Sequence, residues 1–162
     1  MLTQELVKEL FDYVDGKLIR IKVSHKNLNM FLGKEAGHVS KFGYRLIKIN
    51  GKTYRAHRLV FLYHKGYMPE EVDHINGSKS DNRIENLRSA NRQENQWNRK
   101  TGSNNTSGIK GIAWSTRDRQ WIAKIGIVGK RIYLGRFDDL EVAAQIVRIA
   151  RIQHHGEFAN TG

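Results

Sequence analysis

Apolar residues in the first part of the chain change from helical spacing to strand-like alternation. Leucine and valine recur at intervals of three and four near the N-terminus, as on one face of a helix. Two alternating stretches follow, each interrupted by a pair suited to a tight turn, Asp15-Gly16 and Asn50-Gly51. The predicted elements, in order, are a helix over 2–11, hairpins over 13–21 and 44–56, and a short helix over 57–66.

The last third of the chain has a second pattern, in which three alternating stretches precede one helix. The stretches cover 109–114, 120–127 and 131–137. Asp138 is placed to cap the start of the helix and Gly156 to stop it. The turn between the second and third strands is Val128-Gly129, and since a β-branched residue disfavours positive φ, we expect it to differ from an Asn-Gly turn.

A polar stretch over 100–108 separates these two patterns and contains no apolar side chain, which is typical of a connector. We therefore expect an α+β protein. Its predicted parts are an N-terminal helix and hairpin region over 1–55, a core over 56–99, a linker over 100–107 and a C-terminal unit over 108–162, a three-stranded antiparallel sheet packed by one helix.

Charge and cysteine content narrow the possible partners. The 162 residues include 28 Lys and Arg against 16 Asp and Glu, a net charge of +12. Such an excess favours a polyanion, with nucleic acid ahead of an anionic membrane surface. The absence of cysteine excludes disulfides and thiolate zinc sites. With no long apolar run and no secretion signal at the N-terminus, we expect a cytoplasmic protein that does not bind membranes.

The most informative segment runs from 72 to 96 and contains Asp73-His74, Asn86 and Asn95. It resembles the HNH endonuclease motif in the variant found in phage and intron-encoded nucleases, and all four positions match. The resemblance implies a ββα-metal finger in which Asn86 hydrogen-bonds the loop that carries the base. The residues themselves place Asn95 on a helix that opens after Ser89, a plausible N-cap. If a phage encodes the protein, its location is the host-cell cytoplasm.

The same residues suit phosphodiester hydrolysis on chemical grounds. Histidine is the side chain whose ordinary pKa lies near neutrality, so His74 is the natural base. Asp73 and Asn95 offer hard oxygen ligands for one Mg²⁺ or Mn²⁺ ion, completed by water and substrate phosphate. Asp73 and His74 can share a site only if the strand ends there, and the Asn76-Gly77 turn allows that. Arg58 and Arg83 could contact phosphate, although charge on a solvated surface explains them equally well.

The C-terminal unit resembles the plant ethylene-response-factor (Apetala-type) DNA-binding domain. The matching residues fall in 107–114, 121–125, 131–137, 143–144 and 156–159. The resemblance implies a sheet in the major groove, read by strand residues of one parity. The candidates are Trp114, Arg117, Arg119, Trp121, Lys124, Arg131 and Tyr133. Core packing under the helix is the alternative for the two tryptophans.

These observations together predict a metal-dependent HNH endonuclease that cuts double-stranded DNA. A single finger cuts one strand at a time, so we expect a monomer that nicks, with no obligatory protein partner. The alternative from another class is a non-catalytic DNA-binding protein that retains the nuclease scaffold. An RNA-binding protein is a third possibility, but the aromatic strand motifs of the usual RNA modules are missing.

Overall fold

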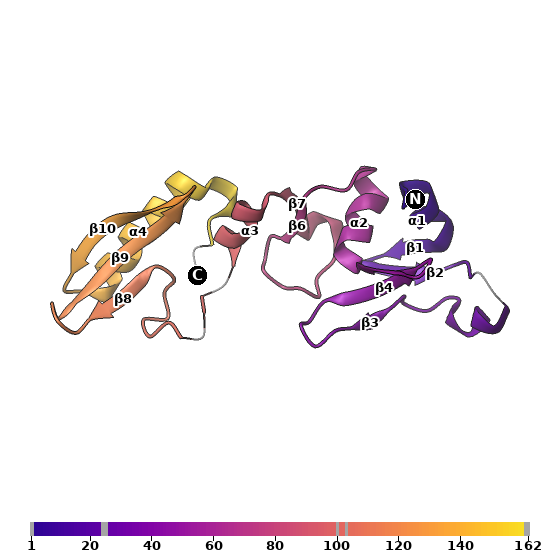
Figure 1. The fold of residues 1–162 in the computed structure, drawn as a ribbon, viewed down its shortest axis with the longest axis horizontal. Coiled ribbons are helices and arrows are strands. Elements are labelled where there is room, and N and C mark those ends of the chain that lie inside the picture. The colour runs from indigo at the N-terminus through magenta and orange to yellow at the C-terminus, as the bar shows by residue number, and fades with distance from the viewer. Residues whose placement is uncertain (1, 24–25, 100, 103, 161–162) are drawn as a thin grey trace. The chain divides into compact units, whose positions relative to one another are not determined.

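A computed structural model describes residues 2–23, 26–99, 101–102 and 104–160 of the chain (Figure 1). Mixed helices and small antiparallel sheets confirm the α+β class. The chain divides into two compact units, Met1–Asn91 and Arg92–Gly162. The polar stretch over 100–107, predicted as the linker, therefore lies inside the second unit, and the residues just before it pack with the C-terminal sheet and helix.

The first unit begins with a helix and a hairpin, as predicted. Its elements are α1 (Gln4–Leu10), β1 (Phe11–Val14), β2 (Lys17–Arg20), η1 (Lys26–Phe31), β3 (His38–Val39), β4 (Arg45–Ile49), β5 (Lys52–Arg55), α2 (Ala56–Lys65), β6 (Glu71–His74), η2 (Ile84–Asn86) and β7 (Leu87–Ala90). Both predicted turn pairs form, because Asp15 and Asn50 adopt the positive φ that short polar residues tolerate, at 44° and 48°.

Buried apolar side chains from α1, β1, β2, β4, α2, β6 and β7 form the core of the first unit. Val7, Phe11, Ile47 and Leu59 are fully buried, and α2 adds Ala56, Val60, Phe61 and Leu62. The helix ends where predicted, at Gly66, whose φ of 77° is the left-handed cap that glycine favours. The sequence analysis missed β3, a two-residue strand that pairs with β4 to make a three-stranded sheet, β3-β4-β5.

The second unit contains the predicted sheet and its helix (Figure 1). Its elements are α3 (Arg92–Asn98), β8 (Ile112–Ser115), β9 (Gln120–Ile127), β10 (Lys130–Phe137), α4 (Leu140–His155) and η3 (Gly156–Phe158). The strand order is β10-β9-β8, and the core is formed by Ile112, Ala123, Ile125, Ala143 and Val147. Within the described residues, no helix has both the length and the apolar content needed to cross a membrane.

Two predicted helix starts are wrong. Asp139, not Asp138, caps α4, because its carboxylate accepts from the backbone N–H groups of Glu141 and Val142. Ser89 does not open the helix that carries Asn95: it lies in β7, paired with Val72, and α3 begins at Arg92.

The turn between β9 and β10 differs from the Asn50-Gly51 turn in the way the sequence predicts. Val128 keeps a negative φ, and only Gly129 takes a positive value, 70°. Helix α4 ends at Gly156, again as predicted.

Candidate nuclease site

Strand β6 ends at His74, at the point where the chain turns. The Gly77 N–H donates to the His74 carbonyl oxygen at 2.8 Å, and Gly77 has a φ of 67°. Both residues of the Asp-His pair are buried, Asp73 at 5% exposure and His74 at 6%. The expectation that the strand ends beside the Asn76-Gly77 turn is confirmed.

Asn86 organises the loop that follows His74. Its backbone carbonyl accepts from the Ile75 N–H at 2.9 Å, and its Oδ1 accepts from the Asn76 N–H at 3.0 Å. Its Nδ2 donates to Asn76 Oδ1 at 3.0 Å and to the Asp81 carbonyl at 2.8 Å. One buried amide therefore closes the loop, which is the contact that the family resemblance led us to expect. Its part in catalysis stays a prediction.

His74 is held by a residue that the sequence analysis did not select. Its Nε2 lies 2.9 Å from Oδ1 of Asn82, which is itself 5% exposed. Because a carbonyl oxygen only accepts, Nε2 carries the hydrogen and Nδ1 carries the lone pair. Burial lowers the pKa of His74 below the ordinary histidine value, and the bond to Asn82 offsets part of that shift. The imidazole is therefore neutral at physiological pH, as a proton acceptor must be.

A second buried histidine lies against the first. The ring of His57, on the first turn of α2, lies 4.7 Å from the His74 ring in an edge-to-face arrangement. His57 is 3% exposed, and burial, followed by the charges of His74 and Arg55, lowers its pKa to about 3. It is therefore a neutral packing partner. The sequence pattern singles out the neighbouring Arg58 but not His57.

Asp73 forms an ion pair across the hairpin with Arg88. The two residues are opposite each other in the β6–β7 register, and Arg88 donates from Nε and Nη2 to Asp73 Oδ2, at 2.9 and 2.8 Å. Both side chains are mostly buried, at 6% and 11% exposure. Among the described residues, no three His, Cys, Asp or Glu side chains are clustered in a way that could hold a metal. Any metal at Asp73 would therefore need other donors.

Asn95, the other predicted ligand, is half-buried on α3 and belongs to the second unit. A joint metal site of Asp73 and Asn95 therefore stays a prediction.

The two arginines predicted to contact phosphate make bonds within the protein. Arg58 donates from Nη1 and Nη2 to the carbonyls of Glu70 and Pro69, both at 2.9 Å, and so fastens the segment before β6. Arg83 donates to both carboxylate oxygens of Asp81 at 2.9 Å, which lowers the pKa of that carboxyl. Arg83 is still 55% exposed and could reach a ligand, whereas the Arg58 bonds favour a structural role.

The N-terminal hairpin supports the segment that carries Asn82. The Ile84 N–H donates to the Tyr13 hydroxyl oxygen at 3.1 Å. Gly16 packs so closely that a Cβ placed there would lie 2.8 Å from the Arg83 nitrogen. The hairpin therefore helps to position the partner of His74, a connection that the sequence pattern does not reveal.

The strand register separates the predicted DNA-contacting residues of the second unit. Lys124 pairs with Tyr133, and Arg131 pairs with Gly126, so these side chains share one face of the sheet. Trp121 pairs with Trp114. It lies two residues before the buried Ala123 in β9, so both side chains point to the face that α4 covers. The expectation that the tryptophans share a face with Lys124 is therefore wrong.

The two tryptophans contact each other edge-to-face, with ring centroids 4.9 Å apart, although Trp114 remains 42% exposed. Arg117 and Arg119 lie in the turn between β8 and β9, and Arg117 forms an exposed ion pair with Asp118.

Comparison with known proteins assigns the class. A family model described as HNH endonuclease matches residues 54–97, which include Asp73, His74, Asn86 and Asn95. The chain is 42% identical over 95 residues to Protein 3.8 of Escherichia phage T7, covering 59% of this chain and 75% of that protein. It is 31% identical over 131 residues to Uncharacterized HNH endonuclease L560 of Acanthamoeba polyphaga mimivirus, covering 79% of this chain and 67% of that protein.

The chain therefore belongs to the HNH endonuclease family. No solved structure matches it with comparable significance. The resemblance of the C-terminal unit to the ethylene-response-factor domain stays a prediction.

Proposed function

We propose that this protein is a metal-dependent endonuclease that hydrolyses phosphodiester bonds of double-stranded DNA, one strand at a time. The observation that carries the proposal is His74, at the end of β6 inside the family match, neutral and fixed by Asn82. A buried imidazole with a lowered pKa can accept a proton from water at neutral pH without first losing its own.

Each neighbouring residue then has a part in holding that base. Asn82 fixes the tautomer of His74, leaving Nδ1 as the nitrogen that accepts a proton. Asn86 keeps the loop after His74 in one shape through its amide bonds. His57 packs against the imidazole and stays uncharged. The base is thus oriented before substrate arrives, as catalysis by a positioned group requires.

The donors available fit a hard divalent cation, Mg²⁺ or Mn²⁺. Asp73 offers a buried carboxylate and Asn95 an amide oxygen, which is the ligand chemistry such an ion prefers. In the first unit Asp73 would hold one ion, which would offset charge on the phosphate and the leaving oxygen, and the part of Asn95 stays as the family motif predicts it. Because Arg88 already donates to Asp73 Oδ2, the carboxylate would have to serve both partners.

The second unit is the proposed DNA-binding part. Lys124, Arg131 and Tyr133 share one face of its sheet and present cations and an aromatic ring to solvent. Strands of this kind can enter the major groove, with arginine pairing to guanine and lysine to phosphate. Arg117 and Arg119 extend the positive charge to the turn before β9. Trp114 and Trp121 lie on the opposite face of the sheet, which α4 covers.

Supercoiled plasmid tests the proposal. The purified protein with Mg²⁺ should convert it to open circles, and EDTA or His74→Ala should abolish conversion. His38→Ala is the matched control, because His38 is an exposed histidine in β3 of the same unit and should cleave normally. Full activity in His74→Ala would refute the assignment of the base, and linear product would refute single-strand nicking by one site.

A non-catalytic DNA-binding protein is the second candidate, and the Asp73–Arg88 ion pair favours it. A carboxylate already neutralised by a buried arginine has less need of a metal ion. This candidate predicts a shift of the plasmid on a gel without any metal-dependent conversion. The same plasmid experiment therefore separates the two functions.

A further inference from the structure

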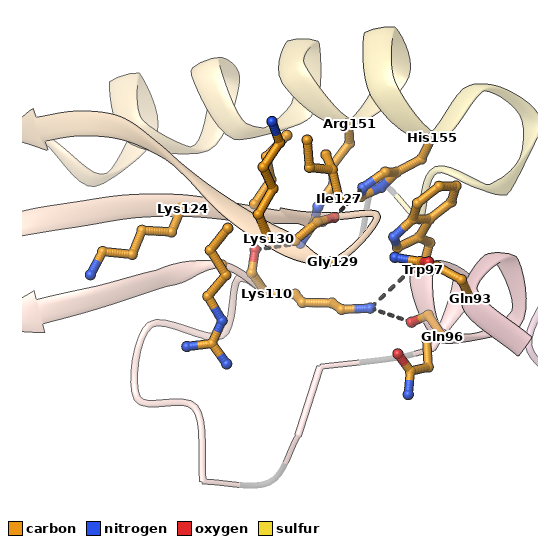
Figure 2. A pocket seen from close by; sticks show the side chains of 14 residues that line it. Gln93, Gln96, Trp97, Lys110, Lys124, Ile127, Gly129, Lys130, Arg151 and His155 are labelled. Carbon is orange, nitrogen blue, oxygen red and sulfur yellow. Dashed lines mark hydrogen bonds between the residues drawn. The ribbon is translucent and has the colours of Figure 1, made fainter.

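The second unit encloses a strongly basic pocket of about 670 Å³ (Figure 2). It lies between α3, the loop before β8, the ends of β9 and β10 nearest their connecting turn, and the end of α4. No aspartate or glutamate lines it, but five cationic side chains do: Lys110, Lys124, Lys130, Arg131 and Arg151. A volume of this size is ordinary for a site that binds a small group.

Two of these cations, the buried Arg151 and the half-buried Lys110, are held in place by neutral oxygens. Lys110 donates from Nζ to the carbonyls of Gln96, Trp97 and Arg99 at 2.9 to 3.0 Å, which Figure 2 shows in part. Arg151, 6% exposed, donates to the carbonyls of Asn160 and Lys110. Neither forms an ion pair within the described part of the chain, so their positive charge is not neutralised.

The rim of the pocket adds cations that the fold does not use. Lys124, Lys130 and Arg131 are exposed, and their side chains form no hydrogen bond or ion pair with the described residues. Lys124 and Arg131 also belong to the sheet face proposed to bind DNA. Lys130 does not, because it pairs with Ile127 on the face that α4 covers.

One wall is a stacked aromatic pair with an unsatisfied nitrogen. The rings of Trp97 and His155 are 4.3 Å apart and nearly parallel, at 10°. His155 is 7% exposed, and its Nε2 donates to the Gly126 carbonyl at 2.8 Å. Its Nδ1 is buried and has no hydrogen-bond partner among the described residues. Because Nε2 donates, Nδ1 of the neutral ring is an acceptor, so a group with a donor, such as water, and not the phosphate itself would complete it.

We propose that this pocket binds a phosphate group of a DNA strand. Below, the buried Arg151 and the half-buried Lys110 form no ion pair among the described residues. Together with the unused cations at the rim they select an anion, and the rim continues into the sheet face that carries Lys124 and Arg131. The inference rests on the proposed function, since it takes DNA as the ligand. It adds a phosphate site on the second unit. This site includes Lys130, a cation that does not lie on the sheet face and that binding by this face alone would not require.

The pocket can be tested without removing its buried residues. Lys130→Gln removes one exposed rim charge. Gly126→Leu keeps the net charge and adds bulk at the pocket wall, on the sheet face that carries Lys124 and Arg131, since Gly126 lines the pocket, lacks a positive φ, and has no atom within 4 Å of an added Cβ. Arg148→Gln is the matched control, because it removes one exposed charge from α4 outside the pocket lining.

Binding is measured by fluorescence anisotropy of a labelled short DNA duplex in EDTA, over a series of salt concentrations. Lys130→Gln should lower the slope of log affinity against log salt by about 0.9, the value for one lost phosphate contact. Gly126→Leu should weaken binding several-fold at constant charge. Arg148→Gln should leave the slope unchanged, and thermal unfolding checks that all three variants fold.

The outcomes separate this inference from the proposed function. If the wild-type protein does not bind DNA, the proposed function fails and the pocket inference fails with it. If wild type binds and both Lys130→Gln and Gly126→Leu match it in affinity and slope, the pocket inference alone is overturned. Thymidine monophosphate is added as a competitor. Displacement of the duplex at comparable concentration would overturn the assignment to a strand in favour of a free nucleotide.

Discussion

Arg88 donates two hydrogen bonds to the same oxygen of Asp73, at 2.9 and 2.8 Å, across adjacent strands of one hairpin. Arg88→Met would leave the Asp73 carboxylate buried without this partner. Breaking a buried pair in this way costs about 3–5 kcal/mol, so we expect a loss of that size in the free energy of unfolding. Urea denaturation measures it.

Arg83→Met is the control, since it breaks a pair whose arginine is 55% exposed, and its effect should be much smaller. Equal effects of the two variants would contradict a structural importance of the buried pair. Asp73→Asn combined with Arg88→Met should recover part of the lost stability, because no charge is then left buried.

Replacement of Asn82 should move the pH profile of cleavage in a direction set by the new side chain. The hydrogen bond from Asn82 raises the pKa of His74 against the larger effect of burial, so Asn82→Ala should lower that pKa further. Asn82→Asp places a carboxylate beside the ring and should raise it. The acidic limb of the rate profile should move to lower pH in Asn82→Ala and to higher pH in Asn82→Asp.

Titration of the His74 ring by NMR provides the same comparison without catalysis. Asn82→Ala should also slow cleavage at neutral pH, because the imidazole loses the bond that fixes its tautomer. Identical profiles in all three proteins would show that Asn82 does not position the base.

Acid should destabilise the first unit through His57. The pKa of this residue is about 3 in the folded protein and about 6.5 when it is exposed, so the folded state binds fewer protons between these values. Stability is therefore complete above about pH 6.5 and falls as pH decreases, by up to about 1.4 kcal/mol per pH unit. Unfolding measured from neutral pH to pH 5 should show this slope.

His57→Phe keeps a ring against His74 and should flatten that slope, since it removes the titrating group. His38→Phe is the matched substitution at an exposed histidine and should leave the slope as in the wild type. A slope unchanged by His57→Phe would assign the acid sensitivity to other groups.

Two glycines provide a matched test of the N-terminal hairpin. Gly16 and Gly51 have almost the same φ, 82° and 80°, so replacement by alanine strains both turns by about 1–2 kcal/mol. Only Gly16 lies against another segment, the backbone of Asn82 and Arg83. Gly16→Ala should therefore cost more stability than Gly51→Ala and should also slow cleavage. Equal effects on cleavage would mean that the hairpin does not support Asn82.

The two faces of the C-terminal sheet should respond differently to truncation. Trp121→Ala removes a half-buried ring from the second core and should cost about 2 kcal/mol of stability, less than a fully buried tryptophan. Tyr133 is 54% exposed on the other face, so Tyr133→Ala should leave stability nearly unchanged and weaken DNA binding several-fold. The opposite pattern would return the DNA-contacting role to the tryptophan face.

Local chemistry explains which parts of the fold could be predicted. Asp15-Gly16, Asn50-Gly51 and Gly66 fix turns and a helix end through their own φ preferences, so the sequence was sufficient there. Ser89 was misassigned because its place depends on pairing with Val72, a contact between residues far apart in the sequence.

The candidate site shows the same division. Asp73, His74 and Asn86 have the spacing of a known motif and could be predicted. The contact of Asn82 with His74 depends on the shape of a loop, and that of Arg88 with Asp73 depends on the register of a hairpin, so neither could be. Trp121 and Lys124 likewise lie on opposite faces of β9. Which of these faces packs against α4 is decided by the tertiary fold and cannot be read from the sequence pattern alone.

The loop after His74 is closed by amides: the side chains of Asn76 and Asn86 bond each other, and Asn86 bonds the Asp81 backbone carbonyl. An amide neither titrates across the neutral range nor weakens in salt as an exposed ion pair does. Ionic strength can therefore be varied without loosening these amide bonds, and the salt-sensitive contact of the loop is the exposed Arg83–Asp81 pair beside Asn82. If Arg83→Met has the same salt dependence of cleavage as the wild type, the salt effect reports how the polyanion approaches the protein and not a change around the imidazole.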